Sequence, residues 1–355
     1  MTTTLATRIS PDEALTLLVE EDLLALGIRA NEVKGRFHAS SDPVTFVIDR
    51  NVNYTNICNV DCMFCAFYRH KEDEDAYTLT YEQIKPKIQE LVEAEGTQLL
   101  LQGGVNPDLP FDYYTDLIGA IRKDYPELTI HAFSPTEIDF MVTLTGWPLK
   151  TVLEKLRDAG MSSLPGGGAE VLDDWVRHKV SPKKVDSLGW LQVMEAAHDI
   201  GMRTTATMMF GMVDRPEHII NHLFKVRELQ DRTGGFTAFI PWTFQPMNTK
   251  LEKLPKTATG VDYLKVLAVS RIVLDNIVNV QSSWITQGLK LCQTGLYFGA
   301  NDVGGLLLEE NVVTQAGVTA ETQSAQTMIN LIHNTGRDAA QRDTAYQILK
   351  RYPRN

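Results

Sequence analysis

The chain has 355 residues, of which 43% are apolar and 22% charged, and its formal net charge is -11. This composition is ordinary for a globular protein, and the negative charge argues against nucleic-acid binding, which needs a basic face. No run approaches the roughly eighteen apolar residues of a membrane span, and the N-terminus lacks the features of a signal peptide. We therefore expect neither nucleic acid nor a membrane as a partner.

The N-terminal segment has the pattern of a helical extension. Ser10-Pro11-Asp12-Glu13 supplies an N-cap, a proline at the first helical position and acids in the first turn. An apolar stripe then follows, made of Leu15, Leu17, Leu18, Leu23, Leu24 and Leu26. We expect residues 1–44 to form a helical extension packed on the main domain.

From residue 45 onward, short apolar strands alternate with amphipathic helices. Strands are expected within residues 44–57 (two strands), 97–104, 128–134, 162–167, 203–211, 236–242, 278–284 and 296–301. Helices are expected between them, for example at residues 81–94, 111–124, 189–200, 217–232 and 263–276. Such alternation indicates an α/β fold of parallel β/α units, and about eight units would close a (β/α)8 TIM-type barrel. An open doubly wound sheet is the alternative.

The barrel is expected to span residues 45–320, and residues 321–355 are expected to form C-terminal helices packed on it. In a barrel of this type, the loops after the carboxyl ends of the strands form the active site. Polar residues and glycines gather at these predicted ends: Gln102-Gly103-Gly104, His131 to Ser134, Pro165 to Gly168, Gln245-Pro246 and Ser282-Ser283-Trp284. Because all of these residues are expected at the same end of the barrel, they predict a ligand site at that rim.

Cys58, Cys62 and Cys65 form a CxxxCxxC triplet directly after the first strand-like run. Three thiolates at this spacing can hold three irons of a [4Fe-4S] cluster and leave the fourth iron open to a small molecule. A structural zinc site is the alternative, although it normally takes four ligands in two close pairs. Reduced thiols favour the cytoplasm. The fourth cysteine, Cys292, is expected to pack inside a helix as a small apolar residue.

The strings NYTNICNVDCMFCAFYR, HAFSPTEI and LPGGGAEVL resemble the radical S-adenosylmethionine enzymes. They are similar to the subgroup that holds the menaquinone enzymes of the futalosine route and the deazaflavin cofactor synthases. TATMMFG, TGGFTAFIPWTFQP and QSSWITQG look most like the dehypoxanthine futalosine cyclases, and the resemblance runs from about residue 30 to the C-terminus. Two departures leave the exact substrate open: Met212 and Asp214 replace an expected histidine and glutamate, and Met247 replaces an expected glutamate.

The resemblance implies two cofactors, a [4Fe-4S] cluster held by the three cysteines and S-adenosylmethionine. It places Phe64 against the adenine, and it implies further cofactor contacts from Gln102, Gly103, Gly104, Ser134, Glu170 and Arg177. Each has a structural alternative. The glycines could form a simple turn, Ser134 could be a helix N-cap, and Glu170 could be a first-turn acid. Arg177 could form a surface ion pair.

By the same resemblance, the substrate is dehypoxanthine futalosine, a ribose joined through a short linker to an aryl carboxylate. A 5'-deoxyadenosyl radical would take hydrogen from the 4' carbon of the ribose, and that carbon would then close a ring onto the aryl group. The closing step loses one electron and one proton, so it needs an electron acceptor, for which the oxidised cluster is a candidate, and a base. His131 is the preferred base, and Asp302, Gln245, Ser283 and Asn301 are further candidates. A hydrogen-bonded strand histidine is the alternative for His131. An external one-electron reductant, such as flavodoxin or ferredoxin, is the implied partner.

Three other functions stay open at this point. Aminofutalosine synthase would add the radical to its substrate instead of abstracting hydrogen. One half of a deazaflavin synthase would use a substrate derived from an aromatic amino acid. A non-catalytic iron–sulfur electron carrier would need the cysteines but no nucleotide pocket.

Overall fold

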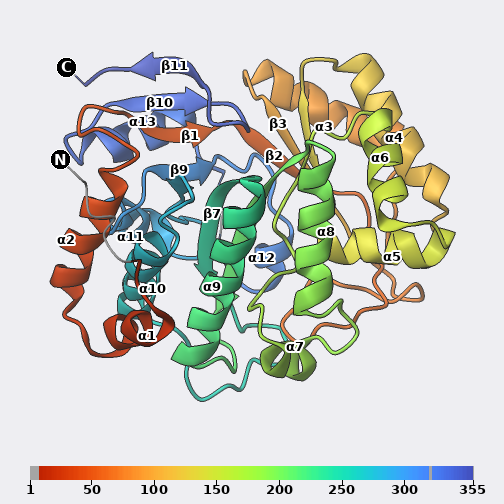
Figure 1. Ribbon diagram of the computed structural model, residues 1–355. Helices are drawn as coiled ribbons and strands as arrows, with labels where there is room; N and C mark the ends of the chain where they lie inside the picture. Colours follow the sequence, from red (N-terminus) through yellow and green to blue (C-terminus); the bar gives the residue numbers. More distant parts are fainter. Residues whose placement is uncertain (1–7, 320–321, 355) are drawn as a thin grey trace.

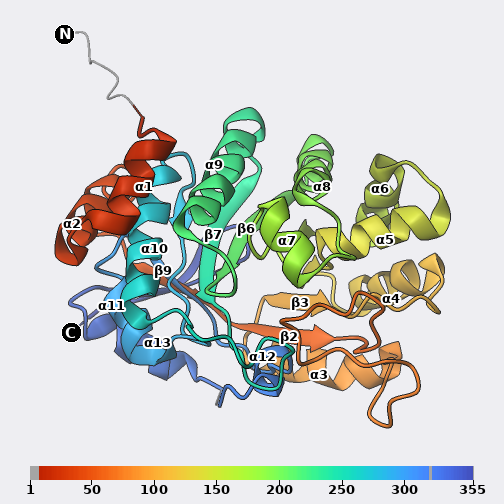
Figure 2. The same ribbon diagram turned by 90° about the horizontal axis from the view of Figure 1, so that it is seen from below.

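The computed structural model describes residues 8–319 and 322–354. Its N-terminal part consists of two helices, α1 (Pro11–Glu20) and α2 (Leu23–Lys34). Ser10 and Glu13 form the expected capping box of α1, and Asp22 caps α2. Both helices pack on α10 (Gly260–Val273), as Figures 1 and 2 show in red and teal. Residues 1–7 of the predicted extension lie outside the described residues.

The central element is a parallel sheet in which the strands follow one another in chain order. These strands are β2 (Asp49–Asn53), β3 (Gln98–Gln102), β4 (Thr129–Ala132), β5 (Ser163–Leu164), β6 (Arg203–Phe210), β7 (Phe236–Thr243) and β8 (Asn279–Val280). The helices between them are α3 (Tyr81–Glu93), α4 (Phe111–Asp124), α5 (Pro135–Thr145), α6 (Leu149–Ala159), α7 (Asp174–Val180), α8 (Ser187–Asp199) and α9 (Pro216–Thr233), with α10 before β8. The predicted parallel β/α units are therefore confirmed.

A second sheet has the strand order β11-β10-β1-β9. Its strands are β1 (Val44–Val47), β9 (Asp302–Gly305), β10 (Ala339–Arg342) and β11 (Ile348–Tyr352). Only Ile48 separates β1 from β2, and β9 pairs in parallel with β1. On its other side β9 meets the end of β8, where the amide of Ser282 donates to the carbonyl of Asp302 at 2.8 Å. β9 thus fills the gap between β8 and β1–β2, which completes a TIM-type barrel rather than an open sheet.

Two sequence-based expectations are wrong in detail. Residues 296–301 form turns after α11 (Gly288–Gly295), and the strand begins only at Asp302. Gly299 there has a left-handed φ of 92°, which extended backbone does not allow. The C-terminal segment is also not purely helical, because α13 (Ala325–His333) is followed by the β10–β11 hairpin. β10 pairs in parallel with the edge of β1 (Figure 1). This pairing outweighs the helical preference of the two alanines at the start of β10.

Alternation along the strands decides which side chains reach the interior of the barrel. In β6, Thr205, Thr207 and Met209 line the interior, whereas Ala206 and Met208 are fully buried in the hydrophobic core. The same alternation leaves the barrel interior largely polar on β2 and β3. None of the described helices is long and apolar enough to cross a membrane.

Candidate active site

A cavity of about 470 Å³ occupies the interior of the barrel and extends to the cysteine triplet. Ten of the predicted site residues line it: Cys58, Cys62, Phe64, Cys65, Gln102, Gly103, Gly104, His131, Ser134 and Glu170. Gln245 and Ser283 also line it, whereas Arg177, Asn301 and Asp302 do not. The structure therefore brings most of the predicted strand-end residues together at one cavity.

The cysteine loop is held by backbone contacts on several sides. The amide of Cys58 donates to the carbonyl of Arg69 at 3.0 Å, and the amide of Cys65 donates to the carbonyl of Cys62 at 3.2 Å. Arg69 in turn donates to the carbonyls of Ala66, Phe67 and Tyr68. Gly104 must be glycine, because a Cβ there would lie 2.2 Å from the carbonyl oxygen of Ile57. The loop conformation is thus set by the chain itself.

The three thiols fit an iron–sulfur cluster by their chemistry and position. They share one end of the cavity and pack with Val60 and Val105. Burial raises the pKa of Cys62 to about 12 and also raises the pKa of Cys65. No three His, Cys, Asp or Glu side chains among the described residues form a ready site for a single metal ion. A polynuclear cluster with three cysteine ligands remains the group that this donor set suits.

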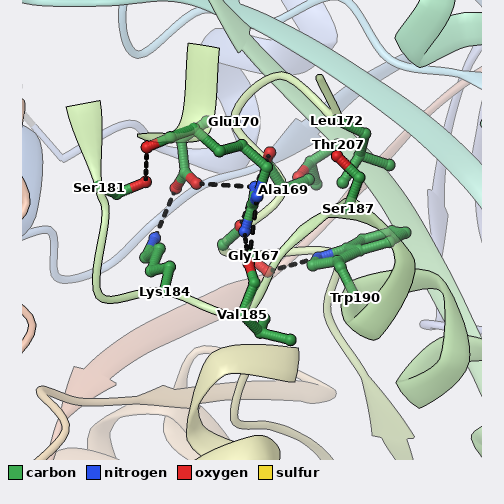
Figure 3. A network of polar contacts seen from close by, with 12 residues as sticks. Gly167, Ala169, Glu170, Leu172, Ser181, Lys184, Val185, Ser187, Trp190 and Thr207 are labelled. Atoms are coloured by element: carbon green, nitrogen blue, oxygen red, sulfur yellow. Dashed lines mark hydrogen bonds and ion pairs between the residues drawn. The ribbon is translucent and has the colours of Figure 1, made fainter. Parts of the chain in front are cut away.

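Glu170 presents a buried carboxylate to the same cavity. Its Oε1 accepts from Nζ of Lys184 at 2.8 Å (Figure 3). Its Oε2 lies 3.6 Å from Nη1 of Arg177 in an ion pair, but makes no hydrogen bond within the described residues. The side chain is only 8% exposed, its backbone has a left-handed φ of 41°, and it precedes α7, so the first-turn alternative does not apply. A buried carboxylate with an oxygen that lacks a hydrogen bond, held on a strained loop at the cavity, indicates a ligand-binding position.

Lys184 was not anticipated from the sequence. Its ammonium lies 5.1 Å from the ring centroid of Phe64 and lines the cavity beside Glu170. Burial lowers the pKa of Lys184, but the adjacent Glu170 carboxylate outweighs this effect and the pKa is raised overall. Lys184 therefore stays charged beside the Glu170 carboxylate. Nothing in the local string SPKKVD distinguishes it from a surface lysine.

Glu137 was also not predicted as a site residue. It holds the predicted strand-end residues Gly103 and Ser134 in position through hydrogen bonds. Its carboxylate accepts from the hydroxyl of Tyr54 at 2.6 Å, the amide of Gly103 at 3.1 Å and the hydroxyl of Ser134 at 2.7 Å. Burial raises the pKa of Glu137 to about 7. Ser134 caps α5 as well as lining the cavity, so both of its expected roles remain compatible with its position. Gly103 is confined too, since a Cβ would lie 2.7 Å from the Tyr54 ring.

Arg177 and Asp302 have structural contacts instead of the predicted site contacts. Arg177 is buried and donates to the carbonyls of Ala169, Gly168 and Val185, which holds the glycine loop before α7. It does not line the cavity, and its ion pair is a buried one with Glu170 Oε2 at 3.6 Å instead of a surface pair. Asp302 is fully buried, and the guanidinium of Arg342 donates to its two carboxylate oxygens at 2.6 and 3.0 Å. A carboxylate held in this way has no access to a substrate.

His131 faces the cavity, but its environment suits a hydrogen-bonding residue better than a base. Its Nδ1 lies 2.6 Å from the hydroxyl of Ser163. Burial, assisted by the nearby Arg342, lowers the pKa of His131 to about 3. Cys292 is fully buried in α11 and donates to the carbonyl of Ser282 at 3.2 Å, so its predicted packing role is confirmed.

Two family models match successive parts of the chain. Residues 52–226 match the Radical SAM superfamily, and residues 233–354 match the CofH/MqnC C-terminal region. The first match contains the three cysteines and Glu170, and the second contains Arg342 and the C-terminal hairpin.

Curated relatives and a solved structure extend these matches. The chain is 43% identical to a cyclic dehypoxanthine futalosine synthase of Halalkalibacterium halodurans, over 97% of this chain and 92% of that protein. It is 42% identical to a 5-amino-6-(D-ribitylamino)uracil–L-tyrosine 4-hydroxyphenyl transferase of Archaeoglobus fulgidus, over 87% of this chain and 89% of that one. The crystal structure of methylornithine synthase superposes with a TM-score of 0.74 at 19% identity, covering 94% of each chain.

Proposed function

This chain belongs to the radical S-adenosylmethionine superfamily, and we propose that it converts dehypoxanthine futalosine to cyclic dehypoxanthine futalosine in the futalosine route to menaquinone. The chain is an enzyme and is similar over almost its whole length to a cyclic dehypoxanthine futalosine synthase. The observation that carries the proposal is one cavity that brings the cysteine triplet together with the buried carboxylate of Glu170, one oxygen of which makes no hydrogen bond within the described residues. This is the arrangement that a cluster and a nucleoside cofactor require.

Cys58, Cys62 and Cys65 would hold the [4Fe-4S] cluster, and S-adenosylmethionine would lie between this loop and Glu170. When bound, the two cofactors supply a 5'-deoxyadenosyl radical that can take hydrogen from an unactivated carbon. Glu170 would accept from ribose hydroxyls of the cofactor, and Lys184 holds its carboxylate in place through a hydrogen bond of 2.8 Å. Phe64 offers an aromatic face for the adenine. Glu137 holds the amide of Gly103, which fixes the Gln102–Gly104 strand end against the cofactor.

The substrate would lie deeper in the barrel. Met209, Ile240, Trp242 and Phe244 give this part of the cavity an apolar wall that suits an aryl group. His131 meets the substrate as a neutral imidazole and acts as a hydrogen-bonding group, because its lowered pKa makes it a weak base. Burial of the bound substrate keeps water away from the reacting carbon.

The two departures from the cyclase pattern lie outside the cavity lining. Met212 is buried in the hydrophobic core, and Met247 is 52% exposed on the surface. Neither side chain lines the cavity, so neither contradicts the cyclase substrate.

A second candidate is the hydroxyphenyl transfer named for the Archaeoglobus fulgidus relative, since the identity to that protein is almost as high. Addition of the radical to substrate, as in aminofutalosine synthase, is a further alternative. The three reactions differ in their products. Cyclisation removes two hydrogen atoms from the substrate, transfer consumes tyrosine, and addition incorporates the adenosyl group into the product.

The test is an anaerobic assay of the reconstituted enzyme, reduced with dithionite and supplied with S-adenosylmethionine and dehypoxanthine futalosine. We expect substrate-dependent 5'-deoxyadenosine and a product two hydrogen atoms lighter than the substrate. No product from this substrate, together with tyrosine-dependent turnover of 5-amino-6-(D-ribitylamino)uracil, would replace the proposal by the transferase. In the cell, we propose that a flavodoxin or ferredoxin supplies the electron in the cytoplasm.

A further inference from the structure

The cavity contains two separate sets of buried polar atoms that lack hydrogen-bond partners among the described residues. One set is Thr136 Oγ1 and Glu170 Oε2, which has an ion pair with Arg177 but no hydrogen bond, and the other is Asn51 Oδ1 and Thr344 Oγ1. All four residues line the cavity. Buried polar atoms without partners are rare in native proteins, because each costs free energy unless a ligand satisfies it. Two such sets indicate two ligand positions.

The second set lies at the floor of the barrel, opposite the cysteine loop. Asn51 is the middle residue of β2 and pairs with Leu100, whereas the cysteines follow the carboxyl end of that strand. Thr344 comes from the turn between β10 and β11, and β10 runs parallel to β1 with Phe46 opposite Gln341. The hairpin turn therefore reaches the cavity from the amino-terminal end of the barrel.

The hairpin turn is held firmly in this position. Arg342 forms a buried ion pair with Asp302, and its guanidinium carbon lies 3.8 Å from the ring centroid of Tyr346. Tyr346 has a left-handed φ of 65°, which is costly for an aromatic residue and persists only where contacts enforce it. These contacts surround Thr344 on both sides in the chain and present it to the cavity.

The charges at the floor select the kind of group that can bind. Asp49 lines the floor, and its carboxylate accepts from the Gln98 amide at 3.3 Å and the Leu307 amide at 2.9 Å. The positive charge of Arg342 is already compensated by Asp302. An anionic group would therefore meet the negative charge of Asp49, whereas hydroxyl groups can donate to Asn51 Oδ1 and exchange hydrogen bonds with Thr344.

We propose that Asn51 and Thr344 form a floor subsite that binds the hydroxyl groups of the substrate's sugar. The identity of that sugar as a ribose rests on the proposed function. The relative from Archaeoglobus fulgidus carries a D-ribityl unit in the name of its substrate, so a subsite for a five-carbon polyol would serve both reactions. Thr344 lies within the residues that match the CofH/MqnC C-terminal region. The C-terminal hairpin thus contributes to substrate specificity as well as to the fold.

The test compares one chemical change at the two ends of the cavity. Thr344→Val and Asn51→Leu should each raise KM for dehypoxanthine futalosine about tenfold, since each removes hydrogen bonds to an uncharged group. Neither should alter the cluster content or the change that S-adenosylmethionine causes in the electron paramagnetic resonance spectrum of the reduced cluster. Thr136→Val, which removes the same hydroxyl near Glu170, should instead weaken the response to S-adenosylmethionine. Gln347→Ala, an exposed change in the same turn, should leave both readouts unaltered.

The outcomes separate this inference from the proposed function. An unchanged KM in both floor variants, with the wild-type enzyme active on dehypoxanthine futalosine, would overturn the subsite alone. If the wild-type enzyme neither binds nor converts that substrate, the proposed function fails. The subsite is then decided by calorimetric binding of 5-amino-6-(D-ribitylamino)uracil. Weaker binding to Thr344→Val than to wild type would support the subsite, and equal or absent binding would overturn it.

Discussion

The rim and the floor of the cavity hold their polar side chains in two different ways. At the rim, short segments of consecutive residues set the geometry, as in the cysteine loop and in the glycine loop that ends at Glu170. At the floor, the geometry comes from an ion pair between strands 40 residues apart in the chain, Asp302 in β9 and Arg342 in β10. The rim can therefore be recognised from local motifs, whereas the floor exists only once the barrel has closed.

The largest expected effect is at the rim. Replacement of Cys58, Cys62 or Cys65 by Ala should abolish cluster assembly and activity, because two thiolates do not hold the cluster securely. Iron analysis and visible absorbance after anaerobic reconstitution provide the measurement. Cys292→Ala is the matched control and should retain nearly all of its iron, since this thiol is buried in α11. Equal iron loss in all four variants would refute the ligand assignment.

The next effect is at the floor and concerns stability rather than cofactor content. Arg342→Met leaves Asp302 buried without its partner, so the free energy of unfolding should fall by about 3–5 kcal/mol. Urea denaturation of the protein before reconstitution measures this change. Arg157→Met breaks an exposed ion pair with Asp158 and should cost at most about 1 kcal/mol. Similar losses in the two variants would contradict the distinction between a buried and an exposed pair.

At the rim, the free energy of unfolding should also depend on pH through Glu137. Burial raises the pKa of Glu137 from 4.5 to about 7, so between these values the folded state binds a proton that the unfolded state has released. The free energy of unfolding should therefore fall as pH rises through this window, by up to about 3 kcal/mol from this group. Glu137→Gln should flatten that decrease. Denaturation of both proteins at pH 5 and pH 7.5, without S-adenosylmethionine, measures it, and identical slopes would count against the prediction.

The smallest expected effect lies outside both ends of the cavity. Met247→Glu restores the residue that the cyclase pattern would place there, yet KM for dehypoxanthine futalosine should change less than about twofold. Met247 is half exposed and does not line the cavity. A several-fold change in KM or kcat in the steady-state assay would show that this surface position controls the substrate after all.

The predictability of the fold follows the same division. The helix at Phe111–Asp124 is found at its predicted residues, because its apolar periodicity and its boundaries are local properties. The β10–β11 hairpin was missed because its strands depend on an edge of β1 almost 300 residues earlier in the chain. The predicted strand at 296–301 was wrong because turn geometry around Gly299 outweighs its aromatic residues.

The candidate site divides in the same way. Cys58, Cys62, Cys65 and Glu170 were predicted from recognisable strings, and all four line the cavity. Lys184 and Glu137 could not be predicted, since only burial and a partner distinguish them from ordinary charged residues. Arg177 was expected to contact the cofactor, but its guanidinium is held by backbone carbonyls and by the Glu170 carboxylate. Residue type alone does not reveal which hydrogen bonds are already made.

The pairing of β1 with β9 and β10 also constrains when the barrel can fold during synthesis of the chain. β1 is synthesised early, at residues 44–47, but its two neighbours are added only at residues 302–305 and 339–342. A growing chain on the ribosome therefore carries an unpaired edge strand until synthesis is almost complete. Closure of the barrel is therefore a late step between distant segments. It is slow because the entropy lost on closing the long loop must be offset before the strands can pair.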